Sequence, residues 1–139
     1  VPAEVGWPGF ATWDQVAAMA QDGFAIGCHT MHHSYLPLVG DDRLPEELVV
    51  SKRMIEERIG RPVTLLSYPV GGFTPKVQSA VQQAGYLAAC TTNRASPRHG
   101  IDPFALRRIK ITERDGHLML FLAKVSGYYD LFRRLREPA

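Results

Sequence analysis

The chain has 139 residues, 45% of them hydrophobic, and its 16 basic and 14 acidic side chains leave a formal net charge of +2. This length and apolar content suit one globular domain with its own core and exclude a disordered chain. A charge so close to balance does not favour binding to nucleic acid or to an anionic membrane, and no apolar run approaches the roughly 20 residues that cross a bilayer. We therefore expect a small or neutral partner.

Capping and turn-forming residues divide the chain into helices that alternate with short apolar strands. A first helix begins after Thr12, which forms a capping box with Gln15, and Gly23 can end it in the left-handed conformation. Further helices are expected over about Leu44–Ile59, with Asp41 or Asp42 as its cap, and after Thr74. The strands are expected at residues 24–28, 63–68 and 86–92.

The last third of the chain contains a loop of turn-formers at residues 93–104, a strand-like alternation at residues 105–111 and a helical spacing over His117–Arg136. Helices alternating with nearly continuous apolar strands predict a single α/β domain over residues 1–139, with a mostly parallel sheet or barrel. In such folds the ligand site lies at the carboxyl ends of the strands. The segments "HTMHH" and "PVGG", which follow two successive strands, should therefore lie side by side on one rim.

Three histidines lie within five positions after the strand at residues 24–28: His29, His32 and His33. Either His29 with His33 or His29 with His32 can converge on one metal if the loop makes a helical or turn-like arc. Neutral imidazoles suit zinc and similar divalent ions, but a catalytic site needs three protein ligands, so the pair is one ligand short. The alternative is that all three are ordinary histidines that make hydrogen bonds on the surface or in the core.

The residue after His29 also limits the chemistry of this segment. An H-E-x-x-H metalloprotease site is excluded, because Thr30 stands where that motif has the glutamate that acts as base. We interpret Thr30 as a residue whose hydroxyl hydrogen-bonds and shapes the loop.

Three segments in order, "FATWDQVAAMAQDGFAIGCHTMHHSYLPL", "RPVTLLSYPVGGF" and "DPFALRRIKI", resemble a polysaccharide deacetylase of the NodB-like kind, carbohydrate esterase family 4. The Y-P-x-G variant in the second segment resembles the exopolysaccharide branch of that family. The resemblance implies a distorted (β/α) barrel, in agreement with the alternation of helices and strands. The family pattern S-H-T-x-x-H-P matches "CHTMHHS", which makes His29 and His33 the metal ligands and leaves His32 at a variable position.

The resemblance also implies an activity, namely metal-dependent hydrolytic de-N-acetylation of an N-acetylated polysaccharide or oligosaccharide. In the family a divalent metal, here expected to be zinc, polarises the acetamide carbonyl and activates a water whose proton goes to an aspartate. The backbone N–H of Val70 would stabilise the oxyanion, and Arg108 matches an arginine that contacts the catalytic aspartate. The rest of the "SYPVGG" segment would shape the sugar groove: Tyr68, Pro69, Gly71 and Gly72. The ordinary alternatives are a strand end with its turn for this segment, and a strand with exposed arginines for "ALRRI".

Two expected motifs are missing from the sequence. It has no T-F-D-D-G motif, which supplies the catalytic base and the third metal ligand in relatives, and no L-x-H motif, which supplies the acid for the leaving amine. Asp41 and Asp42 cannot replace the aspartate pair, because they stand at the start of a helix. The match resembles the C-terminal two-thirds of a domain, which implies an N-terminally truncated barrel. Such a barrel is expected either to self-associate through its exposed edge or to rearrange that edge.

The missing motifs leave two hypotheses about function. In the first, the parent domain is a metal-dependent deacetylase and this chain is a fragment that is incomplete for catalysis. In the second, the chain is complete and is a non-catalytic metal- or carbohydrate-binding remnant of the same fold. The family resemblance places such a protein in the bacterial cell envelope or outside the cell.

Overall fold

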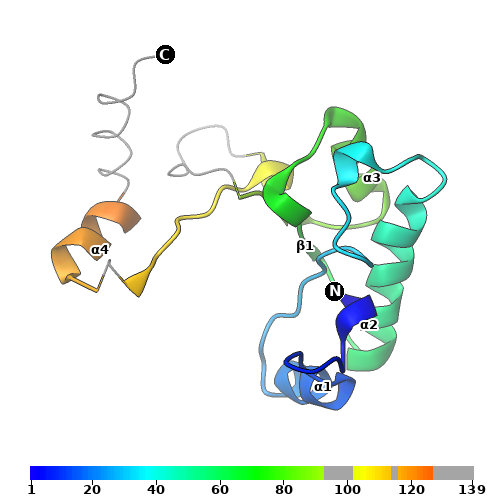
Figure 1. Ribbon diagram of the computed structural model, residues 1–139, viewed down its shortest axis with the longest axis horizontal. Coiled ribbons are helices and arrows are strands. Elements are labelled where there is room, and N and C mark those ends of the chain that lie inside the picture. Colours follow the sequence, from blue (N-terminus) through cyan, green and yellow to red (C-terminus); the bar gives the residue numbers. More distant parts are fainter. Residues whose placement is uncertain (93–101, 114–115, 127–139) are drawn as a thin grey trace.

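The computed structural model of the chain describes residues 1–92, 102–113 and 116–126, in which helices alternate with short strands (Figure 1). Four α-helices are present in these ranges: α1 (Trp13–Gln21), α2 (Ser51–Ile59), α3 (Pro75–Gln83) and α4 (Leu118–Val125). The two strands are β1 (Leu65–Ser67) and β2 (Ala88–Cys90). Short helical segments lie between them: η1 (Pro2–Glu4), η2 (Leu36–Leu38), η3 (Glu46–Val50), η4 (Pro69–Gly71) and η5 (Pro103–Ala105).

The centre of the fold is a parallel sheet. Strand β1 pairs with β2 in parallel, with Leu65 opposite Ala88. Two more segments join the outer edges of this pair through single parallel bridges, Cys28 to Leu66 on one side and Leu106 to Cys90 on the other. Four successive segments of the chain thus run in the same direction, which confirms the predicted parallel arrangement.

The sheet is smaller than the sequence pattern predicts. The expected strands at residues 24–28 and 105–111 are wrong in extent, because each is reduced to one bridge residue. A strand gains its regularity from ladder hydrogen bonds to neighbours, and each of these segments pairs on one side only within the described residues. A barrel needs its first and last strands to meet. The described part of the chain is an open sheet, and the expected barrel is not seen in it.

The first helix forms as the sequence predicts. The side chain of Thr12 accepts from the backbone N–H of Gln15, whose own side chain accepts from the backbone of Thr12, so the capping box is complete. Gly23 follows the helix with φ of 93°, a left-handed conformation that suits glycine. Local sequence signals were sufficient here because every partner lies within the same turn.

The second helix runs from Leu44 through the π-helical segment η3 into α2 and ends at Gly60, whose φ is 68°. Its start differs from the prediction. The N–H of Leu44 bonds to the carbonyl oxygen of Gly40, and Asp41 forms an ion pair with Lys76 of α3. A backbone turn therefore begins this helix where an aspartate cap was expected.

The core lies between the sheet and the inner faces of α2 and α3. Its buried members are spread over residues 28–89: Cys28, Leu36, Leu44, Leu48, Ile55, Val63, Leu66, Tyr68, Val77, Val81, Tyr86 and Ala89. Burying this apolar surface is what holds the sheet and the two helices together.

Helix α4 differs from the other helices because it buries no residue and stands apart from the sheet in Figure 1. Its large apolar side chains are exposed: Leu118, Met119, Leu120, Phe121, Leu122 and Val125. The helix confirms the start of the predicted segment His117–Arg136, while residues 127–136 and most of the predicted loop 93–104 lie outside the described residues. Among the helices of the described ranges, none has the length and apolarity to cross a membrane.

Candidate active site

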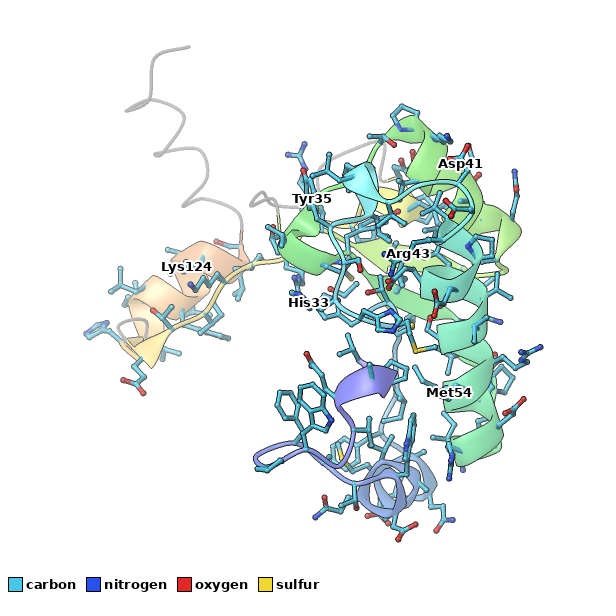
Figure 2. All side chains as sticks on the ribbon, turned by 45° about the vertical axis from the view of Figure 1, so that its right-hand side comes forward. His33, Tyr35, Asp41, Arg43, Met54 and Lys124 are labelled. Carbon is cyan, nitrogen blue, oxygen red and sulfur yellow. The ribbon has the colours of Figure 1, made fainter. Side chains whose placement is uncertain are left out.

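Two loops lie side by side on the rim formed by the carboxyl ends of the parallel segments. We call residues 29–35 the histidine loop and residues 69–73 the glycine loop. Nδ1 of His29 lies 2.5 Å from the carbonyl oxygen of Ser67, and a Cβ on Gly72 would lie 2.2 Å from the ring of Tyr35. In Figure 2, His33 and Tyr35 lie on the main body of the fold, and Lys124 lies on the separate helix α4. The predicted adjacency of the two loops is therefore confirmed.

His29 and His33 face each other across the histidine loop. Their ring centroids are 4.7 Å apart, and the ring planes meet at 78°. When Nδ1 of His29 donates its hydrogen to the carbonyl of Ser67, Nε2 keeps a free lone pair, which is how metal-binding histidines are commonly oriented.

The electrostatics of His29 favour the same neutral form. Burial lowers the pKa of His29 and outweighs the raising effect of the bond to Ser67, and His33 and Arg108 lower it further. Two neutral imidazoles so placed fit a divalent ion such as zinc. Within the described ranges, no group of three histidine, cysteine, aspartate or glutamate side chains could hold a metal, so the third ligand is not found there.

His32 is engaged elsewhere. Its Nδ1 lies 3.0 Å from Oε1 of Glu47, and its backbone N–H donates to Oε2 of the same carboxylate. The structure thus brings His29 and His33 into contact and ties His32 to the helix that follows. Their assignment as ligands and non-ligand stays a prediction.

Glu47 was not singled out from the sequence, although its carboxylate is fully buried beneath the histidine loop. Burial would raise the pKa of Glu47, but hydrogen bonds from His32, Ser34 and Met31 outweigh that effect and hold the pKa below its ordinary value. A weak signal was present: Glu47 falls three residues after Leu44 and four before Ser51, on the buried face of the helix.

The glycine loop is held by the chain that follows β2. The hydroxyls of Thr91 and Thr92 donate to the carbonyl oxygens of Gly71 and Val70, at 2.6 and 2.9 Å. A Cβ on Gly71 would lie 2.4 Å from the backbone nitrogen of Thr92, so only glycine fits at this position. The two glycines of "PVGG" therefore admit two different neighbours, Thr92 at Gly71 and Tyr35 at Gly72.

Val70, the residue predicted to stabilise the oxyanion, has an uncommon backbone conformation. Its φ is 56°, an unusual value for a β-branched residue, and 67% of it is exposed. Its N–H has no hydrogen-bond acceptor in the part of the chain that the structure describes, so this donor is free to bind an oxygen atom of a ligand. The role itself stays a prediction.

The residues predicted to shape the sugar groove lie at two depths. Tyr68, Pro69 and Gly71 are buried, and Gly72 is partly buried. Tyr68 donates its hydroxyl to the carbonyl oxygen of Phe104 at 3.0 Å, and burial, with a smaller effect of Asp102, raises its pKa to about 12. Tyr68 therefore supports the glycine loop from beneath, and direct contact with a sugar stays a prediction.

The surface above the glycine loop contains a hollow of about 480 Å³ lined by Tyr35, Val70, Gly71, Gly72 and Phe73. Sequence reasoning missed Tyr35 and Phe73 as lining residues. Tyr35 follows the three histidines by only two positions, which is the signal that could have identified it.

Arg108 is exposed, and its Nε donates to the carbonyl oxygen of Thr91 at 3.2 Å. This bond places its guanidinium beside the end of β2, near enough to act on the pKa of His29. Its predicted catalytic role stays a prediction.

Thr30 corrects one expectation about the histidine loop. Its side chain is fully buried, but its Oγ1 has no hydrogen-bond partner among the described residues. Thr30 shapes the loop through its backbone, with φ of 62°. Among the described non-glycine residues, positive φ occurs only at Thr30, His33 and Val70, so this uncommon geometry is confined to the two rim loops.

Comparison with known proteins identifies the family of the chain from its sequence. A family model described as polysaccharide deacetylase matches residues 5–89, more than half of the chain. The Bacillus subtilis protein YxkH, named as a polysaccharide deacetylase, is 27% identical over 108 residues, which cover 78% of this chain and 39% of YxkH. A peptidoglycan-N-acetylglucosamine deacetylase of Bacillus cereus is 29% identical over 89 residues, 63% of this chain and 41% of that protein.

The fold agrees with these matches. The structure of the Streptococcus pyogenes deacetylase PplD, solved in complex with acetate, superposes with a TM-score of 0.84 at 20% identity, covering 90% of this chain and 56% of that one. The chain spans about two fifths of the length of the two curated relatives. The chain belongs to the polysaccharide deacetylase family, as the motifs in its sequence predict.

Proposed function

We propose that this protein hydrolyses N-acetyl groups of a polysaccharide or oligosaccharide with the help of a divalent metal, zinc being the expected ion. The observation that carries the proposal is the His29–His33 pair, at 4.7 Å between ring centroids, beside a loop with a free backbone donor. Family membership supports it, because the curated relatives are named as deacetylases of polysaccharide or peptidoglycan. PplD was solved with acetate, which is the product that such a reaction releases.

In the proposed reaction each residue of the rim would have its own role. His29 and His33 would hold the metal, which when bound supplies a Lewis acid for the acetamide carbonyl. The N–H of Val70 would donate to the carbonyl oxygen as negative charge develops on it. The hollow beside Tyr35 and Phe73 would receive the sugar ring, because aromatic side chains provide apolar contact and leave room for polar groups at the edges.

The reaction joins a water oxygen to the acetyl carbon, breaks the carbon–nitrogen bond and releases acetate and an amine. It needs one group to take the proton of the water and one to protonate the amine. Among the described residues no aspartate or glutamate forms a metal-binding group with the two histidines, and the carboxylate of Glu47 is taken up by its bonds to Met31, His32 and Ser34. We therefore assign these two roles to no residue.

That same observation favours a second candidate function. A chain whose described residues provide two imidazoles but no third metal-ligating side chain beside them can bind a metal or a glycan without turning it over. The alternative proposal is therefore a non-catalytic metal- or carbohydrate-binding protein of the same fold.

One experiment separates the two functions. The protein is incubated with zinc and N-acetylglucosamine oligomers, and released acetate is measured beside zinc binding. We expect acetate release that disappears in His29→Ala and His33→Ala and remains in His32→Ala, the matched control from the same loop. Zinc or oligomer binding without acetate release would support the binding protein instead, and equal losses in all three variants would contradict the ligand assignment.

A further inference from the structure

Glu47 is a fully buried carboxylate that the proposed reaction does not use. Four donors surround it: Oε2 accepts from the backbone N–H groups of Met31 and His32, at 3.0 and 3.1 Å, and Oε1 lies 2.8 Å from Oγ of Ser34 and 3.0 Å from Nδ1 of His32. Arg43, one helical turn earlier, is 3.9 Å from the same oxygen. All four donors come from the histidine loop.

His33 lies between two of the residues that make these contacts. His33 is exposed and has φ of 59°, a conformation that is sterically unfavourable for a residue with a Cβ. Both of its neighbours in sequence, His32 and Ser34, bond to Glu47. His29 is fixed independently through Ser67, so the arc between the two histidines has one anchor at each end.

We infer that Glu47 is a positioning residue: its carboxylate holds both sides of His33 and thereby sets the distance and angle between His33 and His29. The inference rests on the proposed metal site, because the pair has to be arranged before a metal arrives. It assigns to the helix after the loop a function that its sequence pattern did not indicate.

The chemistry of the four donors predicts which substitutions matter. Backbone N–H groups can only donate, so the oxygen that faces Met31 and His32 has to remain an acceptor. The imidazole of His32 and the hydroxyl of Ser34 can each reverse their roles, since both groups can accept. Glu47→Gln can therefore keep the arrangement with its amide nitrogen toward Ser34, while Glu47→Ala removes the acceptor altogether.

The test is a zinc titration followed by NMR of the histidine rings, together with the contact between the rings of His29 and His33 in the zinc-free protein. We expect Glu47→Ala to weaken zinc binding by at least about 10-fold, the usual effect of removing a group that orients a metal ligand, and to abolish the ring contact. Glu47→Gln should retain the ring contact and bind zinc within about 3-fold of the unmodified protein. Val81→Ala, a cavity in the core at α3, is the control for lost stability and should leave zinc affinity unchanged.

Each result has one meaning. If the unmodified protein binds zinc and Glu47→Ala binds it equally well, or keeps the ring contact, the positioning role is wrong and the proposed function stands. If Val81→Ala weakens zinc binding as much as Glu47→Ala does at equal stability, Glu47 is only structural, and the inference is overturned. If the unmodified protein binds no zinc, the proposed metal function fails, and the ring contact still decides whether Glu47 arranges the pair.

Discussion

The histidine loop and the glycine loop leave the same rim but are held in opposite ways. A buried charge, the carboxylate of Glu47, collects donors from residues 31–34 of the histidine loop. The glycine loop is held by close packing: because Gly71 has no Cβ, the backbone of Thr92 can approach it more closely than a side chain would allow. The comparison indicates that the shape of the histidine loop depends on the charge of Glu47, and so on pH. The shape of the glycine loop depends instead on the absence of a Cβ at Gly71.

The largest expected effect comes from filling the space in the glycine loop. Gly71→Ala would put a Cβ 2.0 Å from Oγ1 and 2.4 Å from the backbone nitrogen of Thr92, at a φ of 80°. We expect the free energy of unfolding, measured with urea, to fall by about 3 kcal/mol, since overpacking and an unfavourable φ act together.

Gly72→Ala is the matched control for that change. The three atoms nearest to its Cβ would all belong to the side chain of Tyr35, which is exposed and can move aside, so we expect a loss of about 1 kcal/mol or less. Equal losses at both glycines would show that the close approach to Thr92 is not what holds the glycine loop.

An effect of intermediate size is expected at low pH, where the carboxylate of Glu47 that holds the histidine loop becomes protonated. The pKa of Glu47 is lower in the folded protein than its ordinary value of 4.5, so its contribution to stability is present above pH 4.5 and is lost as the pH falls through the folded pKa. Thermal unfolding between neutral pH and about pH 3 should show a steeper loss for the unmodified protein than for Glu47→Gln.

Glu56 also has a lowered pKa, but it is present in both the unmodified protein and Glu47→Gln. The difference between their unfolding curves therefore reports the contribution of Glu47 alone. Burial would raise the pKa of Glu56, but hydrogen bonds from Val63 and Lys52 lower it. Parallel curves for the two proteins would mean that the histidine loop does not depend on this charge.

The smallest expected effect is a gain in stability. Val70→Gly removes an exposed side chain at φ of 56°, so the relief of steric cost should exceed the extra flexibility of glycine. We expect the free energy of unfolding to rise by roughly 0.5 to 1 kcal/mol. Thr30→Gly, at a similar φ but fully buried, should instead lose stability, because it also removes packed atoms. A loss in Val70→Gly would show that the valine side chain is held by contacts that outweigh its strain.

The sequence by itself determined the features that depend on neighbours in the chain. The capping box at Thr12, the glycine that ends α2 and the order of helices and strands follow from residues within one or two turns of one another. The adjacency of the two rim loops also followed, because parallel strands bring their carboxyl ends to one edge. The family motifs singled out His29 and His33 before their contact was known.

Only the tertiary structure decided the features that depend on distant partners. The segments at residues 24–28 and 105–111 alternate like strands, but regular strand geometry requires neighbours that a sequence pattern does not specify. Tyr68 has a motif position that suggested the surface, and its ring lies in the core. Glu47 looked like an ordinary charged residue of a helix, and it became the anchor of the histidine loop because folding brings residues 31–34 against it. A buried carboxylate is stable only where other parts of the chain donate hydrogen bonds to it. The tertiary fold decides which donors come close enough.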